Sequence, residues 1–137
     1  MKIRKVGLAG FGTIGRPVGK ALDDGIEGLE LVAICVRDRA RAEVRMEKFR
    51  KPVPILSPEE LADAADIIVE IAPKAAFYSI AYPALKAGRL LVTVSGAGLL
   101  EHPEIIELAR TGTGRIELAT GALLGLDAVR AAAEGTI

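Results

Sequence analysis

Short apolar runs alternate along the chain with segments of helical periodicity. The runs that predict strands are Ile3–Ala9, Leu29–Val36, Asp66–Ala72, Leu90–Val94 and Ile116–Ala119. Runs that are apolar almost throughout, rather than at every second position, are typical of parallel strands covered on both faces. Their alternation with helices predicts an α/β fold built on a doubly wound parallel sheet.

The segments between these runs predict helices. Their expected bounds are Thr13–Asp23, Arg39–Arg50, Ser57 to about Ala64, Pro73–Ala87, His102–Thr111, and a last helix that ends near Glu134. In the third helix, Ser57 is placed as N-cap, with Pro58 at the first helical position and Glu60 closing a capping box. Pro83 is expected to kink or split the fourth helix. Residues 51–56 are predicted to form an extended connection with room for a short strand.

Composition narrows the class of protein. With 137 residues, 50% of them hydrophobic, the chain is expected to form one domain over residues 1–137. The formal net charge is zero and no basic block occurs, which disfavours nucleic acid and anionic membrane as partners. No apolar run approaches the roughly 18 residues of a membrane span. We therefore expect a soluble cytoplasmic protein.

A glycine-rich turn follows the first apolar run. Residues 10–15 read Gly-Phe-Gly-Thr-Ile-Gly, the spacing G-x-G-x-x-G. In a strand–turn–helix unit, Gly10 permits the tight turn and Gly12 lets the backbone approach a pyrophosphate. The N–H groups from about Thr13 then face the anion at the helix N-terminus. We predict dinucleotide contacts at Gly10, Gly12, Thr13 and Ile14. The alternative is a glycine-rich turn that binds nothing.

Two charged residues follow the second predicted strand, where a dinucleotide places its adenosine ribose. An acid at this point favours the 2′-hydroxyl of NAD, whereas an arginine favours the 2′-phosphate of NADP. Arg37 and Asp38 are both present, and the acid stands later than expected. Arg37 is therefore the favoured ligand contact, and the predicted cofactor is NADP or NAD. Surface charges that merely flank a strand are the alternative.

Small residues follow two further strands at the same edge of the predicted sheet. Ala72 and Ser95 leave room there for a nicotinamide ribose, although turns also use small residues without binding anything. Glu70 lies inside an apolar run, where a buried carboxylate needs hydrogen-bond partners. A structural role, such as bonding to nearby backbone N–H groups, is favoured over acid–base catalysis.

The single histidine and the single cysteine offer little chemistry. His102 precedes a proline at a helix start, which is typical of a surface or capping residue rather than a general base. Cys35 lies in an apolar run and is interpreted as a small buried hydrophobe. With one residue of each type, neither a disulfide nor a transition-metal site is expected. No catalytic residue is predicted.

The stretch 115–128 resembles the strand and turn that close the nucleotide domain of L-aspartate dehydrogenases. The segments 69–72, 92–95 and 10–15 resemble that family in the same order. Gly121 and Ala122, in the closing turn, complete the predicted cofactor contacts. The resemblance covers essentially the whole chain but only the first half of a family member. It therefore implies a Rossmann-type NAD(P)-binding domain without its substrate domain.

The resemblance also implies an activity. Family members oxidise L-aspartate reversibly with NAD(P), giving iminoaspartate or oxaloacetate and ammonia, and a histidine of the second domain is the catalytic group. No catalytic residue can therefore be carried over. The chain departs from the family at Ile71, Lys74 and Leu124, where a small residue, a histidine and a glycine are usual.

The expected partners are a dinucleotide and, with a second domain, a small amino acid; a homo-oligomer is a further option. Two other functions stay open: an NAD(P)-binding regulatory or sensing module without catalysis, and the nucleotide domain of a related amino-acid or small-acid dehydrogenase.

Overall fold

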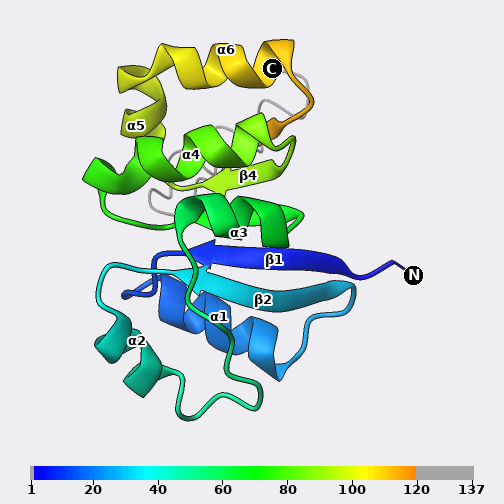
Figure 1. Cartoon of the computed structure of the whole chain (residues 1–137), viewed down its shortest axis with the longest axis vertical. Coiled ribbons are helices and arrows are strands. Elements are labelled where there is room, and N and C mark those ends of the chain that lie inside the picture. Colours follow the sequence, from blue (N-terminus) through cyan, green and yellow to red (C-terminus); the bar gives the residue numbers. More distant parts are fainter. Residues whose placement is uncertain (1, 120–137) are drawn as a thin grey trace, which may run out of the picture.

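The structure, a computed structural model, describes residues 2–119 and is built on a five-stranded sheet (Figure 1). All its strand pairs are parallel, and their order is β2-β1-β3-β4-β5. The bounds are β1 (Arg4–Ala9), β2 (Leu29–Cys35), β3 (Ile67–Glu70), β4 (Leu90–Thr93) and β5 (Arg115–Leu118). Each strand falls inside a predicted apolar run or extends beyond it by one residue. The predicted parallel α/β fold is therefore confirmed.

Helices cover both faces of the sheet. Their bounds are α1 (Gly15–Asp24), α2 (Arg39–Arg45), α3 (Pro58–Ala64), the 3₁₀ turn η1 (Lys74–Ala76), α4 (Phe77–Lys86), α5 (Gly96–Glu101) and α6 (Pro103–Thr111). Helix α1 packs on one face of β1 and β2 (Figure 1). Helix α3 packs on the opposite face of the same two strands, and α4 lies on that face over β3 and β4. None of the helices within residues 2–119 has the length and apolar character needed to cross a bilayer.

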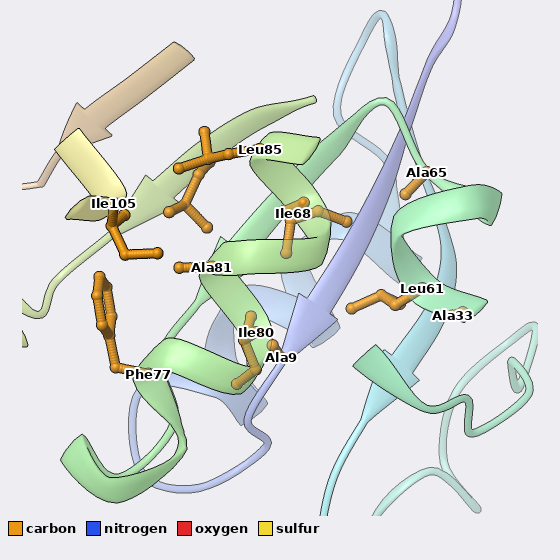
Figure 2. Close-up of a cluster of buried hydrophobic side chains, with 12 residues drawn as sticks. Ala9, Ala33, Leu61, Ala65, Ile68, Phe77, Ile80, Ala81, Leu85 and Ile105 are labelled. Carbon is orange, nitrogen blue, oxygen red and sulfur yellow. The ribbon is translucent and has the colours of Figure 1, made fainter. Parts of the chain in front are cut away.

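Two apolar clusters hold these layers together. On the α3–α4 face, Leu61, Ile80 and Leu85 lie over Ile68 of β3, and Ile105 of α6 completes the cluster (Figure 2). The opposite face buries side chains of β1 and β2 against α1, α2 and the chain that follows α2. Burial on both faces explains why the strands read as continuous apolar runs.

The extended connection before α3 joins the edge of the sheet. Ile55 forms an isolated parallel bridge with Ile34 of β2. The Ile34 N–H donates to the Pro54 carbonyl at 3.0 Å, and the Leu56 N–H donates to the Ile34 carbonyl at 2.8 Å. The chain thus moves outward from β1 through β2 to Ile55, and then returns across β1 to β3. Such a reversal creates a crevice at the carboxyl ends of β1 and β3, where open α/β sheets bind ligands.

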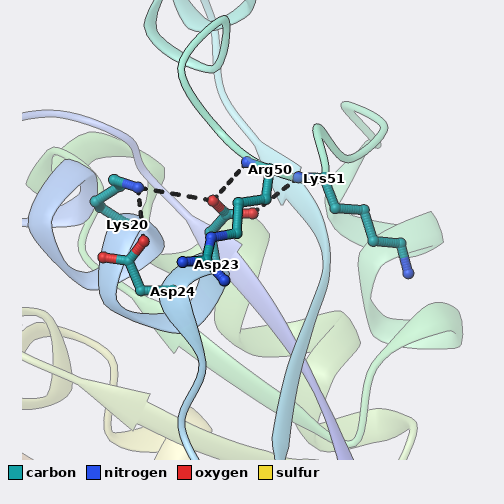
Figure 3. Close-up of polar contacts among 5 residues, drawn as sticks. All are labelled: Lys20, Asp23, Asp24, Arg50 and Lys51. Carbon is teal, nitrogen blue, oxygen red and sulfur yellow. Dashed lines mark hydrogen bonds and ion pairs between the residues drawn. The ribbon is translucent and has the colours of Figure 1, made fainter.

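Helix α2 is shorter than predicted. It ends at Arg45 rather than Arg50, because the chain beyond it is held by a residue of α1. The Asp23 carboxylate accepts the Arg50 N–H at 2.7 Å and the Lys51 N–H at 3.0 Å (Figure 3). Those N–H groups are therefore bonded to a side chain rather than to helical carbonyls. A contact between residues so far apart in sequence is not visible in helical periodicity.

The segment after β3 also differs from its prediction. It opens with the 3₁₀ turn η1 instead of a regular helix, and Pro83 lies inside α4 without splitting it. A proline there cannot donate to the Ser79 carbonyl, but Ser79 is exposed, so water can replace that bond. The capping box of α3 is confirmed: Ser57 Oγ accepts the Glu60 N–H, and Glu60 Oε1 accepts the Ser57 N–H.

Helix α5 was not predicted. Its sequence begins Gly-Ala-Gly, which reads as a turn. Gly98 is buried against Phe77 of α4, and a Cβ at Gly98 would lie 2.7 Å from Phe77 Cγ. The glycine therefore permits close packing of α5 on α4. Composition alone does not distinguish that use from a turn.

Candidate dinucleotide-binding site

A pocket of about 380 Å³ lies at the crevice between β1 and β3. Its walls are the glycine-rich turn after β1, the end of β2, the start of α2 and the segment that follows β3. The volume falls in the range of small-molecule and cofactor sites. The pocket brings together five of the predicted site residues: Gly10, Gly12, Arg37, Asp38 and Ala72.

The first two glycines of the turn have different roles. Gly10 has a φ of +107°, and a Cβ there would lie 2.6 Å from the Ile71 carbonyl oxygen. Gly10 is therefore required by the fold itself. Around Gly12, in contrast, a Cβ would meet nothing within 4 Å. The space beside Gly12 is open to the pocket, as the close approach of a pyrophosphate requires.

Helix α1 begins at Gly15, two residues later than predicted. Thr13 and Ile14 lie in the turn before it and are exposed beside Gly12, without lining the pocket. The first main-chain bond of this region runs from the Arg16 N–H to the Gly12 carbonyl at 3.0 Å. The N–H groups between them lack an acceptor within the helix, which is the arrangement that binds an anion.

Arginines from α2 and from the turn that precedes it bring positive charge to the glycine turn. Arg37, Arg41 and Arg45 all line the pocket. Arg45 Nη1 donates to the Phe11 carbonyl at 2.6 Å, which ties α2 to the glycine turn. On the other side, Arg16 Nε lies 3.4 Å from the Gly12 carbonyl oxygen. This arrangement suits the recognition of phosphate groups.

The charges in this group are crowded. Burial, together with the positive charges of Arg16 and Arg41, lowers the pKa of the Arg45 guanidinium, and Asp38 partly offsets this effect. The guanidinium stays protonated in every ordinary buffer. An anionic ligand would relieve the repulsion, so the electrostatics of the pocket favour a phosphate-bearing partner.

Asp38 has a structural task at the pocket. It is the N-cap of α2, and its Oδ1 accepts the Arg41 N–H at 3.0 Å. Arg37, which precedes it, is exposed at the pocket wall. The contacts predicted from the sequence do not include Arg41 and Arg45. The spacing of four residues from Arg41 to Arg45 was the available signal, since it places these two side chains on one face of α2.

The remaining predicted contacts lie elsewhere. Ser95 follows β4 and does not line the pocket; its N–H donates to Thr93 Oγ1 at 2.9 Å. Glu70 is fully buried, and its Oε2 accepts the Ala72 N–H at 2.9 Å, as its predicted structural role requires. Gly121 and Ala122 lie outside the described residues.

Neither the cysteine nor the histidine is placed as a catalytic group. Cys35 is half-buried at the pocket wall, and burial, with the nearby charge of Glu59, raises the pKa of its thiol. It therefore carries little thiolate at neutral pH. The His102 ring stacks on Phe77 with centroids 6.2 Å apart, and its Nδ1 lies 3.2 Å from Glu104 Oε1. His102 is a helix-junction residue away from the pocket wall.

Comparison with known proteins identifies the family. The family model described as the NAD-binding domain of homoserine dehydrogenase matches residues 10–119. The chain belongs to this family. A solved structure of a homoserine dehydrogenase from Thiobacillus denitrificans superposes with a TM-score of 0.70 at 25% identity, over 86% of this chain and 30% of that protein. The fold and the cofactor expectation, NAD or NADP, agree with membership of this NAD-binding family.

Two relatives of higher sequence identity are both L-aspartate dehydrogenases. The chain is 47% identical over 133 residues to L-aspartate dehydrogenase of Bradyrhizobium diazoefficiens, covering 97% of this chain and 47% of the relative. It is 42% identical to L-aspartate dehydrogenase 3 of Bordetella bronchiseptica, covering 96% and 49%. The resemblance to L-aspartate dehydrogenases is thereby confirmed. The chain spans about half the length of these relatives.

Proposed function

We propose that residues 1–137 form one domain, the nucleotide-binding domain of an L-aspartate dehydrogenase-like oxidoreductase. The observation that carries this proposal is the pocket at the β1–β3 crevice. There, the open space at Gly12 lies beside the guanidinium groups of α2. The identity of 47% to an L-aspartate dehydrogenase supports the substrate.

Each part of the cofactor has a proposed place. The pyrophosphate lies against Gly10, Gly12, Thr13 and Ile14, where N–H groups of the turn face it. The adenosine ribose lies at Arg37 and Asp38. The nicotinamide end lies toward Ala72 and Ser95, with Gly121 and Ala122 beyond them in the chain.

NADP is the favoured cofactor in this proposal. Arg37 and Arg41 line the pocket together, one from the turn after β2 and one from the first turn of α2. Asp38, the acid nearest to this position, is the N-cap of α2, and its Oδ1 accepts the Arg41 N–H. Two guanidinium groups match the charge of a 2′-phosphate better than that of a hydroxyl.

The bound cofactor would supply the hydride acceptor for oxidation of L-aspartate to iminoaspartate or oxaloacetate and ammonia. The residues of this chain would bind and orient the dinucleotide, and a substrate domain would supply the amino-acid site and the catalytic group. A cytoplasmic location and association into a homo-oligomer belong to the same proposal. A single cysteine fits a reducing compartment.

The first test is calorimetric titration of the 137-residue chain with NADP and, separately, with NAD. One-site saturable binding, tighter for NADP, is the expected result. Heat from neither ligand, for a chain that shows a cooperative thermal transition, would refute a working nucleotide domain.

The second test addresses the substrate. The chain is joined to the complementary half of the Bradyrhizobium relative, and formation of reduced cofactor is followed with L-aspartate and with L-homoserine. Aspartate-dependent turnover is expected. Turnover with L-homoserine alone would reject the substrate but keep the nucleotide domain.

A further inference from the structure

A buried carboxylate lies at the carboxyl ends of two neighbouring strands. Glu70 is the last residue of β3 and Thr93 the last of β4, and the two residues are partners in the parallel register. Both side chains have no exposed surface. Within residues 2–119, they are the only polar residues so completely buried.

One hydrogen bond joins this pair, and two more connect it to the turns that follow the strands. Thr93 Oγ1 donates to Glu70 Oε1 at 2.5 Å, and Glu70 Oε2 accepts the Ala72 N–H at 2.9 Å. Thr93 Oγ1 in turn accepts the Ser95 N–H at 2.9 Å. The turn after β3 and the turn after β4 are thus joined through two side chains.

The same network reaches the glycine turn. The Ile71 N–H donates to the Ala9 carbonyl at 2.8 Å. The backbone of residues 71 and 72 lies so close to Gly10 that a Cβ at Gly10 would be 2.9 Å from the Ala72 nitrogen. The turns after β1, β3 and β4 are therefore in continuous contact at one edge of the sheet.

A carboxylate is a costly means of filling this position. Burying a charge without a cation is unfavourable unless hydrogen bonds satisfy it, and an apolar side chain of similar volume would fill the space without that cost. The ion pairs formed within residues 2–119 do not include Glu70. What the carboxylate provides, and an apolar residue cannot, is a fixed position for the Ala72 N–H and the Thr93 hydroxyl.

We propose that Glu70 is a positioning residue for the nicotinamide half of the cofactor. Its carboxylate fixes the turn at Ala72 directly and the turn at Ser95 through Thr93, both relative to the glycine turn. This inference rests on the proposed function, because it assumes that a dinucleotide occupies the pocket. The adenosine half is held by Gly12, Arg37 and Arg41, none of which contacts the pair.

It follows that binding of the nicotinamide half can be weakened without weakening binding of the adenosine half. Loss of the Glu70–Thr93 hydrogen bond should weaken binding of NADP, which reaches the turns at Ala72 and Ser95. It should leave binding of 2′,5′-ADP, which carries only the adenosine end, unchanged. A purely structural role in folding would weaken both ligands or neither.

The experiment compares Thr93→Val, Thr93→Ser and Glu70→Gln with the parent chain by titration with both ligands. Valine keeps the shape of threonine without its hydroxyl, whereas serine keeps the hydroxyl. We expect Thr93→Val and Glu70→Gln to bind NADP roughly tenfold more weakly and 2′,5′-ADP as the parent does. Thr93→Ser should stay within about twofold of the parent for both ligands.

The outcomes are distinguishable. If Thr93→Val and Glu70→Gln bind NADP like the parent, or lose both ligands equally while melting like the parent, the positioning role is wrong and the nucleotide domain stands. If the parent binds neither ligand, the proposed function fails and the inference fails with it. If Thr93→Val does not fold, Glu70→Gln, which keeps one carbonyl acceptor, gives the decisive comparison.

Discussion

Replacing Gly12 by aspartate should weaken cofactor binding strongly while leaving the fold intact. The residue is exposed, and a Cβ there would meet nothing within 4 Å. Its φ is not among the positive values of the described residues, so a side chain causes no backbone strain. Any loss of affinity in this variant therefore reports on the ligand rather than on folding.

The magnitude follows from charge. Two unit charges about 4 Å apart interact with about 4 kcal/mol at an effective dielectric constant of about 20. An exposed carboxylate can turn away and is screened by salt, so about half of that repulsion, or roughly 2 kcal/mol, is a reasonable expectation. This corresponds to about 30-fold weaker binding. Gly12→Asn has the same shape without the charge and is the matched control.

The assay is titration of both variants with NADP at low and at high salt, with thermal unfolding of the ligand-free proteins as a check on the fold. We expect Gly12→Asp to bind about 30-fold more weakly than Gly12→Asn at low salt, with a smaller gap at high salt. Equal affinities for the two variants at low salt would show that no phosphate lies beside Gly12, and the placement of the pyrophosphate would then be wrong.

Three further predictions concern affinity, stability and pH. Arg37→Ala should weaken NADP by about tenfold or more and NAD little, measured by titration with each; equal losses would remove Arg37 from the 2′-phosphate. Gly10→Ala should lower the free energy of unfolding by about 1–3 kcal/mol in urea, because its φ is +107° and its Cβ would contact the Ile71 carbonyl; an unchanged midpoint would contradict this. Burial alone would raise the pKa of Asp23, but hydrogen bonds from two backbone N–H groups, together with the positive charges of Lys20 and Arg50, outweigh it and hold the pKa below the ordinary 3.8. Because the folded state favours the ionised form, this stability is present above about pH 4 and is lost as the pH falls through the lowered pKa. Urea midpoints from pH 6 to pH 2 should fall more steeply for the parent than for Asp23→Asn, and parallel curves would refute the assignment.

The strands and the glycine turn could be predicted because local sequence determines them. Burial on both faces makes a parallel strand apolar throughout, and Gly10 marks a backbone conformation that other residues rarely adopt. The end of α2 could not be predicted in this way, because it depends on Asp23 reaching the N–H groups of Arg50 and Lys51. Helix α5 was missed for a similar reason, since only the packing of Gly98 on Phe77 reveals it.

The residues of the candidate site also fall into two kinds: those that local sequence indicates, and those that depend on contacts between distant segments. The glycine turn follows a short motif, so its place at the pocket could be expected from sequence. The guanidinium of Arg45 lies at that turn only because α2 folds back over it, and its bond to the Phe11 carbonyl joins residues 34 positions apart. The Glu70–Thr93 pair likewise depends on strand register. Single-residue patterns do not carry such information.

The residues proposed to bind the adenosine ribose and those proposed to bind the nicotinamide half belong to different elements, and this has a consequence for cofactor preference. The group at Arg37 and Arg41 depends on α2, whose start is fixed by the Asp38 cap. The group at Ala72 and Ser95 depends on β3 and β4. The two groups face the same pocket, and the Ala72 backbone also approaches Gly10 of the glycine turn. Substitutions in α2 should therefore change the choice between NADP and NAD without moving the turns at the other end. Changes at the ends of β3 and β4 should alter binding of the nicotinamide half equally for NADP and for NAD.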